Sequence, residues 1–340
     1  MSDTTSEHKK NLQHAYYPQQ PIEITIQQPA PNNNVSNYAQ QQIAVQEEPE
    51  QEPIYNPFNF SEEFLANETR LNPQFPVICH GIVQGSDAWL FAEASPRAAR
   101  ISQLLLGERL TVHHQEGEFL FVQSRSDAHC GWVHRSFIYT LKMRPHDARW
   151  RIRCNAAVTV EPDFRSPLRL CLPMGSLVNI AALSWDYVKV ETVGWVHKKH
   201  IVSVDDKFDI VETARSLLGT GYVWGSRNPS FGLDCSALTQ LCYSFAGRQL
   251  PRDSDLQRNY LFRNHQQIRA SEMQAGDLIF IPGHTMIYSG ENTVIHATAA
   301  FMRVIEEDFS VCIDRLKKQA NGEKLAITAF HWIDTEDEEA

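Results

Sequence analysis

The 340-residue sequence lacks long apolar runs. No stretch approaches the roughly 18 apolar residues of a membrane-spanning helix, and the polar first ten residues lead into no apolar segment. We therefore expect no membrane span and no signal peptide. A cytoplasmic protein is the simpler expectation, with export by a route that needs no signal as the alternative.

Cysteine is present but lacks the spacing that binds metals. The seven cysteines are odd in number and form no CxxC pair. A disulfide framework or a zinc site is therefore not expected, and free thiols fit a reducing compartment.

An excess of positive charge is also missing. The formal charge of −10 comes from the two ends, because residues 1–60 and 334–340 each carry a net charge of −5 while residues 61–333 hold 29 acidic and 29 basic side chains. Nucleic-acid-binding domains need a concentrated positive face, so nucleic acid is not an expected partner. Residues 1–60, rich in Gln, Asn, Pro and Glu, are predicted to be a disordered tail, and 334–340 an acidic tail. Scattered aromatic residues between Ile54 and Leu71 indicate an ordered lead-in to the folded body.

Two stretches, at 75–140 and 150–202, have the alternating hydrophobicity of short strands. They end alike, in Gly131-Trp132-Val133-His134 and Gly194-Trp195-Val196-His197, 63 residues apart. This repetition predicts two copies of one small β-barrel. The endings resemble the last strand of bacterial SH3-type domains, which implies two SH3-like barrels. We expect both tryptophans in the barrel cores, with ligand contact as the alternative, and both histidines at the surface.

The pattern changes after residue 203. Apolar residues from Phe208 to Leu218 have helical spacing, with Asp205-Asp206 placed to cap the helix and Gly219 to end it. A glycine-rich loop up to Asp234 then leads into a second helix that Gly247 closes. Strands are predicted near 277–281, 286–288, 293–296 and 326–330. Helices followed by antiparallel strands predict an α+β domain at 205–333.

Cys235 begins the second helix of this domain. Free backbone N–H groups and the helix dipole at that position favour the thiolate, although a buried inert thiol, as expected for Cys242, is the alternative. His284 begins one predicted strand and His296 lies 12 residues later in the next, so the two are expected to be neighbours across a strand pair. A thiol next to a histidine that a second polar group orients is the arrangement of an activated nucleophile.

Six segments resemble, in order and spacing, the NlpC family of papain-like cell-wall cysteine peptidases. They are Leu218-Gly-Thr-Gly-Tyr-Val-Trp-Gly, Gly232-Leu-Asp-Cys-Ser-Ala-Leu, Leu250-Pro-Arg-Asp-Ser, Gly276-Asp-Leu-Ile-Phe, Gly283-His-Thr-Met-Ile-Tyr and Val294-Ile-His-Ala. The resemblance implies a papain-like domain with Cys235 as nucleophile, His284 as general base and His296 as the orienting residue, working without a metal or other cofactor. It also implies that Tyr222, Asp234 and Ser236 line the cleft.

The family's usual reaction is hydrolysis of the γ-D-glutamyl–diamino acid bond in peptidoglycan stem peptides, so peptidoglycan-derived peptides are the expected partners. Members that combine SH3-type domains with an Arg-Asp-Ser stretch prefer a free N-terminal L-Ala. On that analogy Asp253 and Ser254 bind the substrate ammonium, with helix capping by 251–254 as an equal alternative. Trp89 and Glu93 are candidates for the same pocket.

Two residues depart from the family pattern, and two further histidines are candidate site residues. Ser226 and Met286 replace small residues that are usual in the family, and each is expected to narrow the cleft. His265 and His331 are expected to be structural or solvated. Two alternative functions stay open: a catalytically inactive cell-wall binding module that acts through its SH3 domains, and an amidase or acyltransferase on the same fold.

Overall fold

The computed structural model describes residues 53–319 and 325–334, so most of the predicted N-terminal tail and nearly all of the acidic C-terminal tail lie outside the described residues. The described residues all belong to one compact unit. Within the described ranges, no helix is long and apolar enough to cross a membrane.

The lead-in before the first strand is folded, as expected. Ser61 caps the short helix α1 (Glu62–Asn67), and Phe58 and Phe60 are buried against Tyr260 of the later helix α4. The predicted boundary of the disordered tail is therefore wrong at its end. Residues 53–60 belong to the folded body because their aromatic side chains have an apolar surface to cover.

The first β unit, residues 79–141, is a seven-stranded sheet with strand order β3-β2-β6-β5-β4-β1-β7. Its strands are β1 (Cys79–Val83), β2 (Asp87–Phe91), β3 (Arg100–Leu105), β4 (Arg109–Glu116), β5 (Phe119–Ser124), β6 (Cys130–His134) and β7 (Ile138–Leu141). Side chains that alternate along these strands enclose a core of ten buried apolar residues, among them Leu90, Val122 and Val133.

The second β unit, residues 150–203, contains a five-stranded and a three-stranded sheet. Its strands are β8 (Trp150–Ile152), β9 (Ala156–Thr159), β10 (Leu168–Leu172), β11 (Leu177–Val178), β12 (Ile180–Ser184), β13 (Tyr187–Val190), β14 (Gly194–His197) and β15 (Ile201–Ser203). The two β units meet backbone to backbone, where the N–H of Leu177 donates to the carbonyl of Leu106 at 2.8 Å. Gly107 makes this approach possible, since a Cβ there would lie 1.9 Å from the Leu177 oxygen.

The repeated Gly-Trp-Val-His endings have matching structures. In each, the histidine caps a short 3-10 helix, with Nδ1 of His134 accepting from the N–H of Ser136 and Nδ1 of His197 from that of Lys199. The 3-10 helices are η1 (Arg135–Phe137) and η2 (Lys198–His200).

The core position predicted for the two tryptophans is wrong. The valine after each tryptophan is fully buried, whereas Trp132 and Trp195 are half-buried, because alternation along a strand turns neighbouring side chains to opposite faces. Trp132 packs on Phe121 and His114 outside the core.

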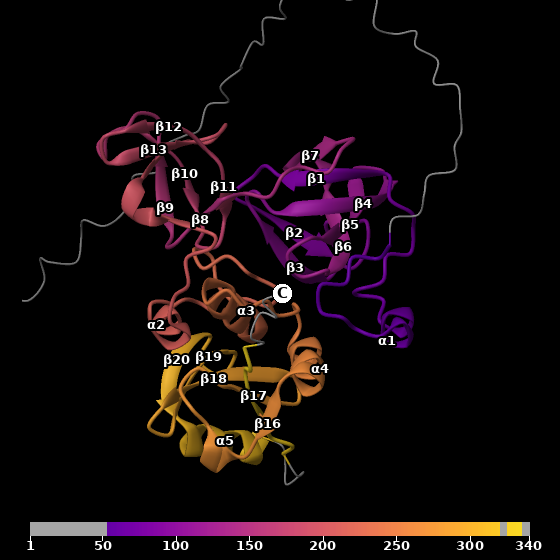
Figure 1. Ribbon diagram of the computed structural model, residues 1–340, viewed down its shortest axis with the longest axis vertical. Helices are drawn as coiled ribbons and strands as arrows, with labels where there is room; N and C mark the ends of the chain where they lie inside the picture. Colours follow the sequence, from indigo (N-terminus) through magenta and orange to yellow (C-terminus); the bar gives the residue numbers. More distant parts are fainter. Residues whose placement is uncertain (1–52, 320–324, 335–340) are drawn as a thin grey trace, which may run out of the picture. The chain divides into compact units, whose positions relative to one another are not determined.

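The α+β domain has a six-stranded antiparallel sheet with order β16-β21-β17-β18-β19-β20. Helices α2 and α3 cover one face of this sheet, and α5 packs on the other (Figure 1). The elements are α2 (Ile210–Arg215), α3 (Cys235–Phe245), α4 (Ser254–Asn264), β16 (Gln266–Ile268), η3 (Ala270–Glu272), β17 (Leu278–Ile281), β18 (His284–Gly290), β19 (Thr293–Thr298), β20 (Arg303–Asp308), α5 (Phe309–Gln319) and β21 (Thr328–His331).

Most predicted elements of this domain are present, with two differences. The cap of α2 is Asp209, whose carboxylate accepts from the N–H of Glu212, and not Asp205-Asp206. Leu217 is buried where the helical stripe predicted Leu218, which is exposed. Strands β16 and β20 and helix α5 were not predicted from the sequence.

Candidate active site

Cys235 is buried at the first position of α3, where Asp234 is the N-cap. The Asp234 carboxylate accepts from the N–H of Ala237 and from the N–H of Gly225, both at 2.9 Å. It therefore ties the glycine-rich loop to the first turn of the helix and fixes the backbone on both sides of the thiol.

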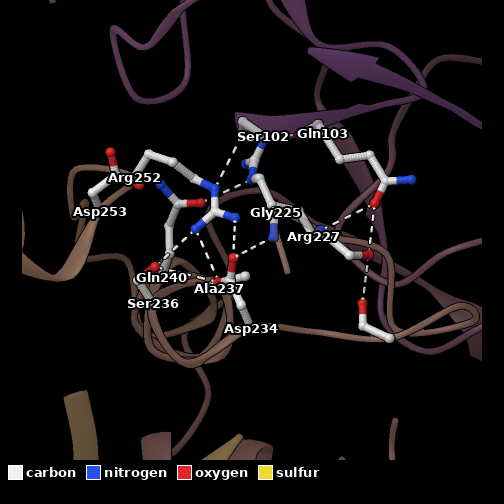
Figure 2. A network of polar contacts seen from close by, with 12 residues as sticks. Ser102, Gln103, Gly225, Arg227, Asp234, Ser236, Ala237, Gln240, Arg252 and Asp253 are labelled. Atoms are coloured by element: carbon white, nitrogen blue, oxygen red, sulfur yellow. Dashed lines mark hydrogen bonds and ion pairs between the residues drawn. The ribbon is translucent and has the colours of Figure 1, made fainter. Parts of the chain in front are cut away.

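Arg252, a residue that the sequence did not single out, holds this helix start from the opposite side. Its guanidinium is fully buried and donates to both oxygens of Asp234, at 2.6 and 3.0 Å, and to Oγ of Ser236 at 2.8 Å (Figure 2). Its Nε donates to Oγ of Ser102 on β3 of the first β unit, at 3.0 Å. The side chains of Asp234 and Ser236 are thus hydrogen-bonded within the protein, and their place along a substrate cleft stays a prediction.

A second arm of the same network holds the glycine-rich loop. Oε1 of Gln103, also on β3, accepts from Oγ of Ser226 at 2.8 Å and from the N–H of Arg227 at 3.1 Å (Figure 2). Arg227 in turn forms an ion pair with buried Glu108 at 2.9 Å and donates to Gln240 of α3. The first β unit therefore supports the glycine-rich loop before Cys235 directly.

Neither departure from the family pattern narrows a cleft. Ser226 is fully buried and donates to the carbonyl of Gly232 as well as to Gln103, so its hydroxyl serves the contact with the first β unit. Met286 is fully buried beside Cys312 in the core under α5. Both expectations failed because a residue type does not reveal which side of a loop or strand it faces.

The other end of α3 is held by the second β unit. The Arg151 guanidinium, on β8, donates to the carbonyl of Ser244 at 2.8 Å and to that of Asp206 at 2.6 Å, and it lies over the ring of Phe245. A cation at a helix C-terminus satisfies free carbonyls and suits the helix dipole. Helix α3 is consequently held at its first turn by the first β unit, through Arg252, and at its last turn by the second.

Burial of the Cys235 thiol opposes the thiolate that the helix dipole was expected to favour. Burial raises the pKa of Cys235 to about 12, the nearby Asp234 charge adds to this, and the N–H groups of Thr285 and Ser236 offset only part of it. Burial likewise lowers the pKa of His284 to about 3. The N–H of Thr285, the residue after His284, lies close to the thiol, so Cys235 lies beside the start of β18.

His284 and His296 lie together, as predicted from their spacing. Nε2 of His284 is 2.8 Å from Nδ1 of His296, across the β18–β19 pair. The relay continues to Glu307 on β20, whose Oε1 is 2.8 Å from Nε2 of His296, and then to Arg315 of α5, which forms a two-pronged ion pair with that carboxylate. The sequence reading missed Glu307 and Arg315.

Three of these side chains have a spacing that a metal could use. One ligand atom each from His296, Glu307 and Cys312 lies within 4.8 Å of the others. The Arg315 guanidinium already supplies positive charge there, bonding to the Glu307 carboxylate and lying 3.6 Å from the Cys312 sulfur. The donor set therefore fits a hydrogen-bonded relay better than a cation site.

The predicted substrate residues have different surroundings. Tyr222 is half-buried near the thiol, and burial, with the nearby Asp234 carboxylate, raises its pKa to about 12. Asp253 is the N-cap of α4 but makes no side-chain cap bond. Instead its Oδ2 pairs with Arg70 of the lead-in at 2.8 Å, so the capping alternative is wrong for this side chain. Ser254 is the first residue of α4 and is partly exposed.

The first β unit reaches the glycine-rich loop with Trp89. The Trp89 ring is 6.1 Å from that of Phe231, four residues before Cys235, and the Arg100 guanidinium lies over the Trp89 ring at 4.6 Å. Glu93, in contrast, is exposed in the turn after β2.

The remaining two histidines have structural partners, as expected. His265 stacks on Trp332 with ring centroids 4.0 Å apart, and Nδ1 of His331 is 2.7 Å from Asp277.

Comparison with known proteins identifies both kinds of unit. Residues 219–318 match the NlpC/P60 family, and residues 90–138 match the bacterial dipeptidyl-peptidase SH3 domain. The chain is 25% identical over 252 residues to dipeptidyl-peptidase 6 of Lysinibacillus sphaericus, covering 64% of this chain and 88% of that protein. It is 32% identical over 111 residues to a bifunctional muramidase/DL-endopeptidase of Bacillus subtilis, covering 29% of this chain and 32% of that protein.

A solved structure shares the fold. It is an NlpC/P60 family protein from Bacillus cereus, with a TM-score of 0.59 and 18% identity, and the match covers 73% of this chain and 98% of that one.

Proposed function

We propose, from the NlpC/P60 domain at residues 219–318, that this chain is a cysteine endopeptidase that cleaves the γ-D-glutamyl–diamino acid bond of peptidoglycan stem peptides. The observation that carries the proposal is a buried thiol at a helix N-terminus, close to the backbone N–H that follows His284, together with the 2.8 Å contact between His284 and His296. The relatives named as a dipeptidyl-peptidase and a DL-endopeptidase support the substrate class.

The chemistry follows from the protonation states. Because the resting pair is a thiol and a neutral imidazole, His284 takes the Sγ proton as sulfur attacks the amide carbon. The tetrahedral oxyanion is accepted by backbone N–H groups at the start of α3, among which that of Ser236 is close to the sulfur. The imidazolium then protonates the leaving amine as the C–N bond breaks, and water hydrolyses the thioester to the free acid and the thiol.

For substrate selection, Asp253 remains our proposed partner of a free N-terminal ammonium. Its side chain keeps 27% exposure, and one carboxylate oxygen is bound to Arg70, which leaves Oδ1 to receive the amine. We propose that Ser254 and Tyr222 line the same ammonium-binding pocket, and that Trp89, beside Phe231, extends this pocket from the first β unit.

We also propose that the second β unit is a second SH3-like domain. Support comes from the shared Gly-Trp-Val-His ending, 63 residues apart, and from the identical use of its histidine as the cap of a 3-10 helix.

The test uses the full chain and defined peptides read by mass spectrometry. We expect L-Ala–γ-D-Glu–diamino acid peptides to be cut after D-Glu, N-acetylation of L-Ala to slow cleavage, and Cys235→Ala to abolish it. Cys154→Ser, at an exposed thiol, is the matched control and keeps activity. Cleavage by Cys235→Ala would refute the mechanism. A cut at another amide, or transfer to an added amine, would establish the amidase or acyltransferase alternative, and binding without turnover would establish the binding module.

A further inference from the structure

The hydrogen bonds that lead from His284 through His296 to Glu307 each have a defined donor and acceptor. A carboxylate can only accept hydrogen bonds, so the 2.8 Å contact between Glu307 and Nε2 of His296 requires a hydrogen on that nitrogen. Arg315, which donates to both oxygens of Glu307, keeps the carboxylate ionised. Burial alone would raise the pKa of Glu307, but Arg315 and His296 outweigh it and lower the pKa.

The donor and acceptor of the next hydrogen bond, between His296 and His284, follow in the same way. Burial lowers the pKa of both histidines, which favours a neutral ring with one hydrogen in each. With its hydrogen on Nε2, His296 presents a lone pair at Nδ1, and Nε2 of His284 donates to it across 2.8 Å. The hydrogen of His284 is then on Nε2, and its Nδ1 is left as a bare, basic nitrogen.

Besides His296 itself, the charged and titratable groups in and around the relay come from three elements. They are His284 on β18, Glu307 on β20, and Arg315 and Cys312 on α5. Glu307 is the one acceptor-only group among them, and it bonds to the end of the relay that is farther from the thiol.

We propose that Glu307, kept ionised by Arg315, is a positioning residue that sets the tautomers of His296 and His284 and thereby leaves Nδ1 of His284 free to accept the Cys235 proton. The proposal rests on the proposed function for its catalytic meaning. Its structural part, the tautomer of each ring, can be measured without any substrate.

Glu307→Gln is the informative substitution because it keeps the shape. Arg315 needs an acceptor and takes the single amide oxygen, so the NH₂ group turns to Nε2 of His296 and donates to it. His296 then carries its hydrogen on Nδ1, donates to Nε2 of His284, and leaves the hydrogen of His284 on Nδ1. The nitrogen that should accept the thiol proton is now occupied.

The first measurement is the tautomer of both rings by ¹⁵N NMR on full-length Cys235→Ala protein with and without Glu307→Gln. We expect the hydrogen on Nε2 of both histidines while Glu307 is present, and on Nδ1 of both once Glu307→Gln is introduced. Unchanged tautomers after this substitution would overturn the proposal.

The second measurement is turnover and the rate of Cys235 alkylation by iodoacetamide. Loss of the general base lowers kcat/KM by about 10²-fold or more, with KM little changed. The double variant Glu307→Gln with Arg315→Met also lacks the guanidinium, so the amide oxygen is free to accept from His296. We expect it to regain at least about a tenth of the rate that Glu307→Gln loses. A double variant no faster than Glu307→Gln would refute the tautomer argument.

Glu306→Gln is the matched control on the same strand. Glu306 pairs with Arg215 at 3.0 Å, outside the relay, and its variant should keep both tautomers and full activity. If the wild-type chain fails to cut the γ-D-glutamyl peptides while Glu307→Gln still inverts the tautomers, the proposed substrate is wrong and the role of Glu307 stands.

Discussion

Nε of Arg252 donates a hydrogen bond to Oγ of Ser102, 150 residues earlier in the chain, at 3.0 Å. Arg252 bonds at the same time to Asp234 and Ser236, the two neighbours of Cys235. One buried guanidinium thus joins the first β unit to the residues on both sides of the thiol.

Arg252→Met should destabilise the protein strongly. It leaves the Asp234 carboxylate buried without its cation, which costs about 3–5 kcal/mol of unfolding free energy. Urea unfolding followed by circular dichroism measures the loss. Arg135→Met, which breaks an exposed ion pair with Glu118, is the control and should leave the unfolding midpoint unchanged. Equal effects of the two substitutions would show that the buried pair has no special role.

Ser102→Ala separates fold from function. It removes one hydrogen bond, with a cost of about 1 kcal/mol, and keeps the Arg252–Asp234 pair. Because it loosens the support of the nucleophile's helix, kcat should fall more than KM rises. A change in KM alone would assign Ser102 to substrate binding.

Arg151→Met tests the grip on the last turn of α3. The substitution removes the bonds to the carbonyls of Ser244 and Asp206, at an expected cost of about 2 kcal/mol for charged hydrogen bonds. Thermal unfolding measures it. Arg153→Met, whose guanidinium lies over Phe208 nearby, is the comparison and should have the smaller effect.

The pH dependence of thiol alkylation tests the resting state of Cys235. With a pKa of about 12 the thiolate fraction rises tenfold for each pH unit below that value, so alkylation should accelerate steadily from pH 6 to 9 without a plateau. Iodoacetamide labelling with mass spectrometry of the Cys235 peptide follows it. A plateau that begins in acid would show a preformed thiolate–imidazolium pair.

Phe58→Ala tests whether the lead-in belongs to the fold. Phe58 is fully buried against Phe60 and Tyr260, so its removal should cost about 3–5 kcal/mol. Ile54→Ala, at an exposed side chain, should change stability by less than about 0.5 kcal/mol. Indistinguishable unfolding curves would mean that the lead-in is only loosely attached.

What the sequence could predict depended on local patterns. Alternation and glycine positions predicted β17, β18 and β19, and the 12-residue spacing brought His284 and His296 together as found. Glu307 was out of reach because β20 is an edge strand in which only Val304 is buried, too little apolar pattern to reveal a strand.

Long-range polar contacts were also out of reach. Arg252 lies within a matched segment, yet nothing in that segment shows that its guanidinium is buried or that Ser102 is its partner. The helix dipole likewise predicted a thiolate at Cys235, because burial of the thiol, which sets its pKa, appears only in three dimensions.

The close approach at Gly107 couples the positions of the two β units. With a Cβ excluded by the Leu177 oxygen, even alanine there would act as a wedge between them. One β unit holds the first turn of α3 and the other holds the last. A side chain that forces the two units apart at Gly107 therefore strains α3, which carries Cys235, although Gly107 is far from Cys235 in sequence. The position of Cys235 therefore depends on the correct packing of both β units.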